Sequence, residues 1–162
     1  MTRFTGSPRL DRLDQRITRT MAEHGLTLMR ISLGIVFLWF GAVKFFPGLS
    51  PAESLAGRTI ETLTLGYVAQ PLALFVLAAL ECLIGLGLLS GLFMRATLAL
   101  LFVQMLGTLT PLVMFPAETF VAFPYAPTLE GQYIIKNVVL IAGAVILGAT
   151  VRGGRLVSES PP

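Results

Sequence analysis

The residue most able to do chemistry in this sequence is Glu81, because it lies near the middle of a long apolar stretch, 71–92. If that stretch crosses a membrane, the carboxyl group lies near the bilayer midplane. An ionised group at that depth costs on the order of 3 kcal/mol. Glu81 must therefore be protonated, paired with a cation or directed into a wet cavity.

Four polar residues in the other apolar stretches are candidate partners for Glu81: Lys44, Gln104, Lys136 and Asn137. Both lysines lie toward the membrane edge, on the side opposite the termini, so each can instead extend its ammonium group outward to water. The sequence leaves two interpretations of the cluster open. It binds a ligand, or it is a buried polar network that specifies how the helices pack.

The stretch that carries Lys44 has a distinctive helical stripe. Arg30, Phe37 and Lys44 recur at every seventh position, and Gly34 and Gly41 share their face of an ideal helix. Small residues let membrane helices approach closely. We therefore expect this face to point into the protein and to bring its two cations with it.

Three further side chains need an interpretation: Trp39, Cys82 and His24. Trp39 lies in mid-stretch, and we interpret it first as interior packing, with a flat wall against a ligand ring as the alternative that places it in the site. Cys82 adjoins Glu81 but points about 100° away from it on an ideal helix, and we expect it to be inert. His24 is interpreted as an interfacial polar residue. A single cysteine and a single histidine offer no metal site and no evident cofactor ligands.

The composition requires a membrane. Hydrophobic residues make up 54% of the 162 residues, charged residues make up 13%, and the mean hydropathy is +0.78. Soluble domains have about a quarter charged residues, and a fold of this size could not bury so much apolar surface inside. The net charge of +3 does not indicate nucleic acid, because the cations cluster at the ends of the apolar stretches.

We therefore expect an all-α membrane protein. The predicted fold is a four-transmembrane-helix bundle with an N-terminal amphipathic interfacial helix and short loop helices on the outer side. Its expected divisions are a cytoplasmic amphipathic segment 1–25, the bundle 26–151 and a polar cytoplasmic tail 152–162. The predicted spans, each near the roughly 20 residues that cross the hydrocarbon, are 26–46, 71–92, 96–115 and 133–151.

Local patterns support the segments outside the spans. Ser7 is a plausible N-cap for a basic amphipathic helix over 7–25 that lies on an anionic membrane surface. Ser50 with Glu53 resembles a capping box and predicts a short surface helix. The segment 116–132 is rich in proline and aromatic residues, which suits an irregular loop in the membrane interface.

The distribution of cations predicts the orientation. Most arginines, including Arg95 between the second and third spans, fall on the side that carries both termini. The positive-inside rule then places both termini in the cytoplasm.

Three stretches together resemble a known family. They are "RISLGIVFLWFGAVKF" in the first span, "LECLIGLGLLSGLFMR" through the second span and its turn, and "GQYIIKNVVLIAGAVIL" in the fourth. Over residues 28–151 the chain resembles the DoxX-like family of small four-helix membrane proteins, nearest its reactive-chlorine-resistance branch. The resemblance implies a bundle in a bacterial inner membrane. It also implies a link to quinone-dependent oxidoreduction or oxidative stress, and it transfers no catalytic residue.

Three functions follow as hypotheses. The first is a non-catalytic subunit or stress-related component that binds a quinone or another apolar ligand beside Glu81, with electrons from a redox partner protein. We expect the chain on its own to be an accessory subunit rather than an enzyme. The alternative is that it is part of a quinone-linked oxidoreductase. The second is a small homo-oligomeric transporter or channel for an anionic solute, with Lys44 and Lys136 at its mouth. The third is a structural subunit of a larger membrane complex.

Overall fold

The computed structural model describes residues 8–50, 53–154 and 156. Long helices dominate it, and a small two-stranded sheet, with β1 antiparallel to β2, lies in one connection. In chain order the elements are α1 (Pro8–Val43), α2 (Glu53–Leu63), α3 (Gln70–Ser90), α4 (Met94–Leu109), α5 (Pro111–Met114), α6 (Pro116–Thr119), β1 (Phe120–Ala122), β2 (Ala126–Pro127) and α7 (Leu129–Thr150).

Four helical segments are long and apolar enough to cross a membrane: α1, α3, α4 with α5, and α7. They correspond to the four predicted spans, so the expected all-α bundle is confirmed. The boundaries differ by a few residues. The first span ends at Val43 rather than at Phe46, and the fourth begins at Leu129, four residues before the predicted start.

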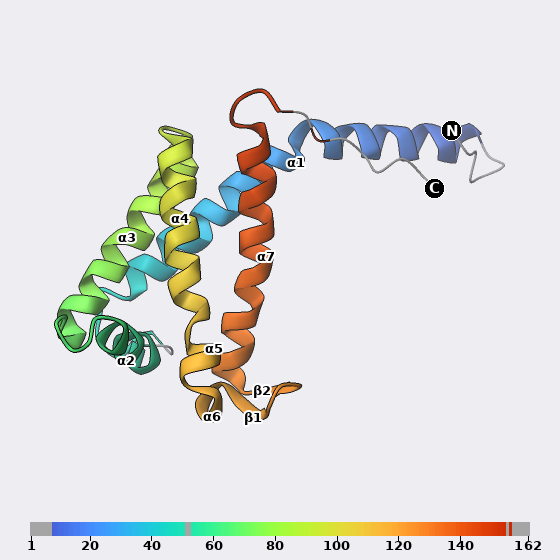
Figure 1. The fold of residues 1–162 in the computed structure, drawn as a ribbon. Coiled ribbons are helices and arrows are strands. Elements are labelled where there is room, and N and C mark those ends of the chain that lie inside the picture. Colours follow the sequence, from blue (N-terminus) through green and yellow to red (C-terminus); the bar gives the residue numbers. More distant parts are fainter. Residues whose placement is uncertain (1–7, 51–52, 155, 157–162) are drawn as a thin grey trace.

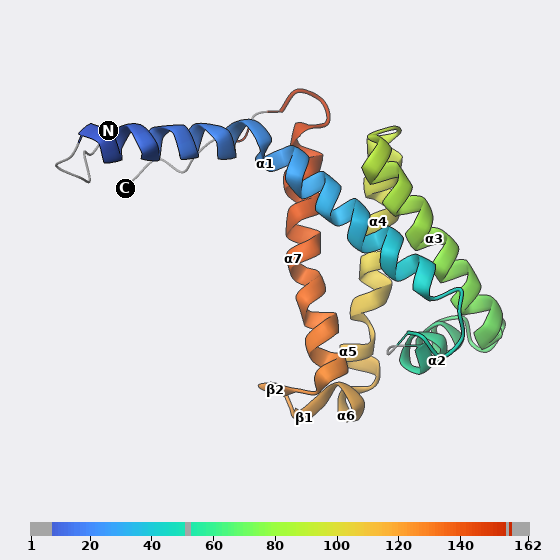
Figure 2. The same cartoon turned by 180° about the vertical axis from the view of Figure 1, so that it is seen from behind.

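The helix α1 unites two segments that the sequence analysis kept apart. The amphipathic segment and the first span form one continuous helix of 36 residues. Its first half projects sideways from the bundle, and its second half runs across the other helices (Figures 1 and 2). The apolar side chains of the projecting half, Leu10, Leu13, Ile17 and Met21, are exposed, as expected of a helix that lies on a membrane surface. Ser7, the predicted N-cap, lies outside the described residues.

The bundle has two distinct ends. The projecting half of α1, the α3–α4 turn and the end of α7 lie together at one end, which we call the terminal end (Figure 1). The helices α2, α5 and α6 and the hairpin lie at the other, which we call the loop end. Arg95 stands exposed in the first turn of α4, at the terminal end, as the sequence predicted.

Glycines let α1 and α3 pack most closely. A Cβ atom built on Gly41 would lie 2.8 Å from Glu81 Cβ, and one on Gly85 would lie 2.5 Å from the backbone nitrogen of Leu38. Gly34 is equally close to Leu89. The predicted glycine face of the first span therefore points inward, against α3.

A cluster of buried apolar side chains forms a core in the terminal half of the bundle, and further buried apolar residues lie toward the loop end, namely Leu55, Ala73, Leu74, Ala78 and Ile134. The core joins all four long helices, while the large apolar side chains on their outer faces remain exposed, where lipid would cover them. The core consists of Leu33, Phe37, Ile84, Leu88, Leu98, Leu101, Met105, Ala144 and Leu147.

Polar contacts fasten the loop end. Arg58 of α2 forms an ion pair with Glu118 of α6, and its guanidinium lies 5.3 Å from the centre of the Phe115 ring. Both side chains of this pair are exposed, and the hydrogen bond with Arg58 lowers the pKa of Glu118. Glu53 Oε2 accepts a hydrogen bond from the Gly48 N–H at 2.7 Å, so the predicted capping residue does reach back, although to Gly48 rather than to Ser50. The segment predicted as an irregular loop contains the short β1–β2 hairpin.

Candidate functional site

Glu81 is buried between α1 and α4, with 7% of its surface exposed. It lies on α3 opposite Gly41, whose missing side chain leaves room for the carboxyl stem. Lys44, the first residue beyond α1, donates from Nζ to Glu81 Oε2 at 2.6 Å. A lysine therefore does turn inward to Glu81, and a carboxylate in this apolar region acquires the cation that it needs.

Gln104 of α4 completes the polar cluster. Its Nε2 donates to Glu81 Oε1 at 3.0 Å and to Thr108 Oγ1 at 3.2 Å. Thr108 in turn donates to the Gln104 backbone carbonyl. The other amide atom, Gln104 Oε1, is buried and accepts no hydrogen bond from any described residue. We call Glu81, Lys44, Gln104 and Thr108 the polar cluster. Thr108 was not singled out as a site residue from sequence.

Lys136 and Asn137 do not join this cluster. Lys136 is exposed on α7, and its ammonium lies 5.5 Å from the centre of the Tyr133 ring. Asn137 is half-buried, and none of the hydrogen bonds found between described residues involves its side chain. Lys136 therefore takes the outward alternative, which its place about two turns from the start of α7 permits.

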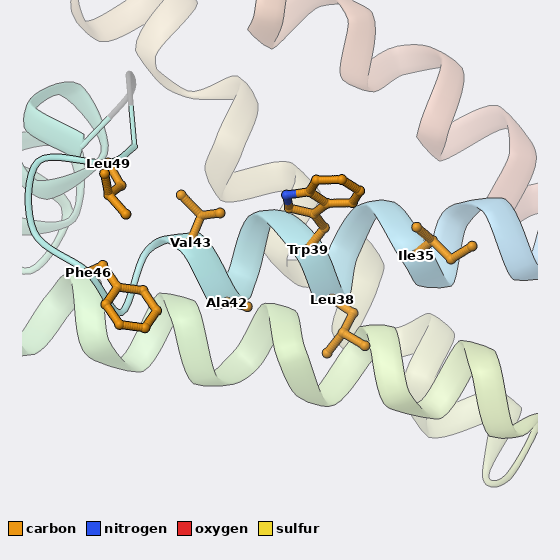
Figure 3. A pocket seen from close by; sticks show the side chains of 7 residues that line it. All are labelled: Ile35, Leu38, Trp39, Ala42, Val43, Phe46 and Leu49. Carbon is orange, nitrogen blue, oxygen red and sulfur yellow. The ribbon is translucent and has the colours of Figure 1, made fainter.

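The preferred interpretation of Trp39 as interior packing is wrong. Its side chain is 67% exposed and lines an open groove of about 480 Å³ on the outer surface of α1 (Figure 3). The lining of the groove is apolar and consists of Ile35, Leu38, Trp39, Ala42, Val43, Phe46 and Leu49. On an ideal helix Trp39 and Lys44 point about 140° apart, so the groove and the polar cluster occupy different sides of α1.

The groove and the polar cluster come near each other at one point, the end of α1. Val43 and Phe46 line the groove, and Lys44, which lies between them in sequence, contacts Glu81. The helix α1 ends at Val43, and the chain turns there. Beyond that residue, α1 no longer lies between the groove and the polar cluster.

Other candidate chemistry is weaker. Cys82 is half-buried, and its Sγ donates a long hydrogen bond of 3.8 Å to the Leu38 carbonyl. Within the part of the chain that the structure describes, no group of His, Cys, Asp and Glu side chains is placed to hold a metal ion.

Arg30 has a role that its sequence position alone did not indicate. Its Nη1 donates to the carbonyls of Leu88 at 2.6 Å and Leu89 at 3.0 Å, in the last turn of α3. A cation at the carboxyl end of a helix is favoured because the last carbonyls lack helical partners. The helical stripe predicted that Arg30 points inward, but it did not identify the Leu88 and Leu89 carbonyls as its partners.

Comparison with known proteins identifies a family. The DoxX family model matches residues 25–116. The matched segment runs from Gly25 in α1 through α3, α4 and α5, and so includes Lys44, Glu81 and Gln104. No curated protein and no solved structure matches the chain.

Proposed function

The chain belongs to the DoxX family of integral membrane proteins, and we propose that it is a non-catalytic membrane component that binds a quinone or a similar apolar carbonyl compound. The polar cluster is the proposed contact for the polar head of the ligand. The groove on α1, with Trp39 in its wall, is the proposed surface for the apolar tail.

One observation carries the proposal, the unpartnered Gln104 Oε1. Leaving a buried acceptor without a hydrogen bond costs about 1–3 kcal/mol. The cost is largest in an apolar environment, where water cannot replace the partner. A ligand that donates a hydrogen bond to this oxygen would remove the cost, and the hydroxyl group of a quinol is such a donor.

The cluster has the groups that both forms of the ligand require. The Lys44 ammonium can donate to a quinone carbonyl while it stays close to Glu81. The Gln104 amide can serve either protonation state of Glu81. With the ionised carboxylate its Nε2 donates, and with the protonated acid a rotated amide accepts. In each arrangement one polar atom of the amide remains for a ligand.

The groove suits the tail of such a compound. Its walls are aliphatic and aromatic, and it opens on the outer surface of α1, from which a lipid-soluble molecule would enter (Figure 3). Its volume of about 480 Å³ lies within the roughly 300–1,000 Å³ of small-molecule sites.

The proposal assigns binding and proton handling to this chain. Electrons would pass between the ligand and a redox partner protein in the same membrane. A bacterial inner membrane, with both termini cytoplasmic, is the proposed location, because the terminal end carries Arg95 and the basic half of α1.

The transport hypothesis gains no support from the geometry. It required Lys44 and Lys136 to form one positive mouth, and the two lysines have different partners, Glu81 and Tyr133. A purely structural role would leave the polar cluster without a purpose beyond packing, and the experiment below distinguishes that role from ligand binding.

The test is the content of the purified protein. The full chain, in mild detergent, would be extracted with organic solvent and compared by mass spectrometry with Glu81→Gln and Gln104→Met variants. The matched control is Glu61→Gln, which alters an exposed carboxylate of α2. We expect the wild type and Glu61→Gln to retain a quinone and the cluster variants to lose it. Bulk phospholipid alone in every extract, with the variants still folded, would rule the proposal out.

A further inference from the structure

A second hollow lies at the terminal end of the bundle, between α1, α4 and α7. Its volume is about 220 Å³. This is smaller than the roughly 300–1,000 Å³ of sites for drug-sized molecules. It combines apolar walls with one cation and hydroxyl groups, and its lining includes Leu26, Thr27, Arg30, Met94, Leu147 and Thr150.

We infer that this hollow binds the phosphate group of an anionic phospholipid, with Arg30 as the cation. The inference rests on the charge, the donors and the depth of the hollow. It is independent of the proposed quinone site, which lies toward the other half of the bundle.

The charge of Arg30 is oriented but not neutralised. Its Nη1 donates to the Leu88 and Leu89 carbonyls, which fixes the plane of the guanidinium. Carbonyl oxygens carry no net charge, and none of the ion pairs among the described residues includes Arg30. Nε and Nη2 are engaged in no hydrogen bond with a described residue. A guanidinium with two free nitrogens matches the geometry of a phosphate, which it can bind through paired hydrogen bonds.

Other groups of the hollow add to this attraction. The Thr27 hydroxyl is a further donor, and it lies one turn from Arg30 on α1. Met94 is the first residue of α4, and the preceding Phe93 provides no side-chain cap. The first-turn amides of a helix without such a cap give that end a partial positive charge.

The depth of the hollow fits a lipid headgroup. Arg30 contacts the last turn of α3, Met94 begins α4, and Thr150 ends α7. Three membrane-crossing helices thus end around the hollow, at the level where the hydrocarbon gives way to headgroups. Leu26 and Leu147 offer an apolar surface to the first carbons of the acyl chains.

The test uses the full-length protein, delipidated in detergent and given equal amounts of phosphatidylglycerol and phosphatidylcholine with the same chains. Native mass spectrometry then measures the ratio of the two lipids retained. We expect the wild type to prefer phosphatidylglycerol, and Arg30→Gln to reduce that preference about tenfold. The control, Arg95→Gln, removes an exposed arginine at the same end that does not line the hollow, and should leave the ratio unchanged.

Because Arg30 also holds α3, a second variant keeps the test decisive if Arg30→Gln does not fold. Thr27→Val leaves Arg30 in place and should reduce the preference roughly threefold. Equal retention of both lipids by the wild type would overturn the inference. So would an equal loss in Arg95→Gln, which would indicate general surface charge.

An added arm with inorganic phosphate identifies the source of the bound group. Displacement of phosphatidylglycerol by phosphate would show that the phosphate group alone is sufficient for this site. Failure to displace it would show that the intact lipid is required. Both results support a phosphate site at Arg30, provided that the wild type prefers the anionic lipid.

Discussion

The two halves of the bundle bury their helix contacts in different ways. In the terminal half, α3 meets α1 and α4 through aliphatic side chains such as Ile84, Leu88 and Leu101, which are fully buried. One turn farther from the terminal end, the same helices meet through Glu81, Lys44 and Gln104. The terminal half packs mainly through aliphatic side chains, although Arg30 donates to the Leu88 and Leu89 carbonyls there. The two halves therefore differ in the kind of polar contact: Arg30 meets backbone carbonyls at a helix end, whereas the polar cluster contains a buried ion pair. The cluster also leaves Gln104 Oε1 without a partner among the described residues, which is why we propose a function for it.

The glycine contacts sharpen the comparison, because they are common to both halves. Gly34 and Gly85 bring α1 and α3 together beside the aliphatic core, and Gly41 does so beside Glu81. Close approach is thus a property of the whole helix pair, while the buried ion pair is local to one turn.

The largest effect is expected from Lys44→Met, which leaves the buried Glu81 without its cation. Removing one partner of a buried ion pair typically lowers the free energy of unfolding by about 3–5 kcal/mol. The folded fraction should be measured by chemical unfolding in detergent. The double variant Lys44→Met with Glu81→Leu should recover most of the loss, and Lys136→Met, at an exposed lysine, should be close to neutral. Equal losses for Lys44→Met and Lys136→Met would contradict the geometry.

A smaller loss is expected from Gly85→Ala, which tests the shared contact. The added methyl would lie 2.5 Å from the Leu38 backbone nitrogen, so the helices must separate. Overpacking of this kind costs about 1–3 kcal/mol. The control is Gly107→Ala in α4, where nothing lies within 4 Å, and which should be neutral or slightly stabilising. Thermal unfolding in detergent compares the two, and the same result for both would be evidence against the close packing of α1 on α3.

Gln104→Met should cost less still, about 1 kcal/mol, although it removes a buried hydrogen bond to Glu81. The variant also removes the unpartnered Oε1, and that gain offsets part of the loss. The same unfolding measurement applies. A loss of stability as large as that of Lys44→Met would show that Gln104 is needed to hold the buried ion pair. Its amide would then not be available to bind a ligand.

The smallest effect is expected at the loop end, from Arg58→Gln. The hydrogen bond with Arg58 lowers the pKa of Glu118 in the folded protein, so the pair stabilises the fold above the ordinary carboxyl pKa. That contribution is lost as the pH falls through the lowered value. The variant should return the Glu118 pKa toward its usual range, as measured by NMR titration of the carboxyl carbon. An unchanged pKa in Arg58→Gln would show that the ion pair does not persist in solution.

Sequence patterns predicted the bundle well because each apolar stretch is long and contains few polar residues. They also predicted the inward face of α1, since Gly34, Gly41 and Lys44 repeat with helical spacing. They did not predict that Trp39 faces outward while Lys44 contacts Glu81. Both residues lie in one span, and only the packing of α3 determines which side of α1 is covered. They also offered Lys136 as a partner of Glu81, with an outward orientation as the alternative. Depth does not determine direction, and Lys136 points outward onto Tyr133.

The α1 helix illustrates a second limit. Its two parts differ in composition, and the boundary near Gly25 suggested separate elements. Nothing within 4 Å of Gly25 crowds the helix there, and the backbone continues without a break. Composition marks the change of environment from membrane surface to membrane interior, but the helix itself does not end at that boundary.

The most direct test of the quinone proposal uses Trp39, the single tryptophan of the chain. It lines the groove, and it lies about 7.5 Å along the helix axis from Lys44. Purified protein in detergent would be titrated with a short-chain benzoquinone while the fluorescence of Trp39 is recorded, with Glu81→Gln as the comparison. The account predicts saturable quenching near one equivalent in the wild type and only weak, linear quenching in the variant. Linear quenching of equal slope in both proteins would contradict it.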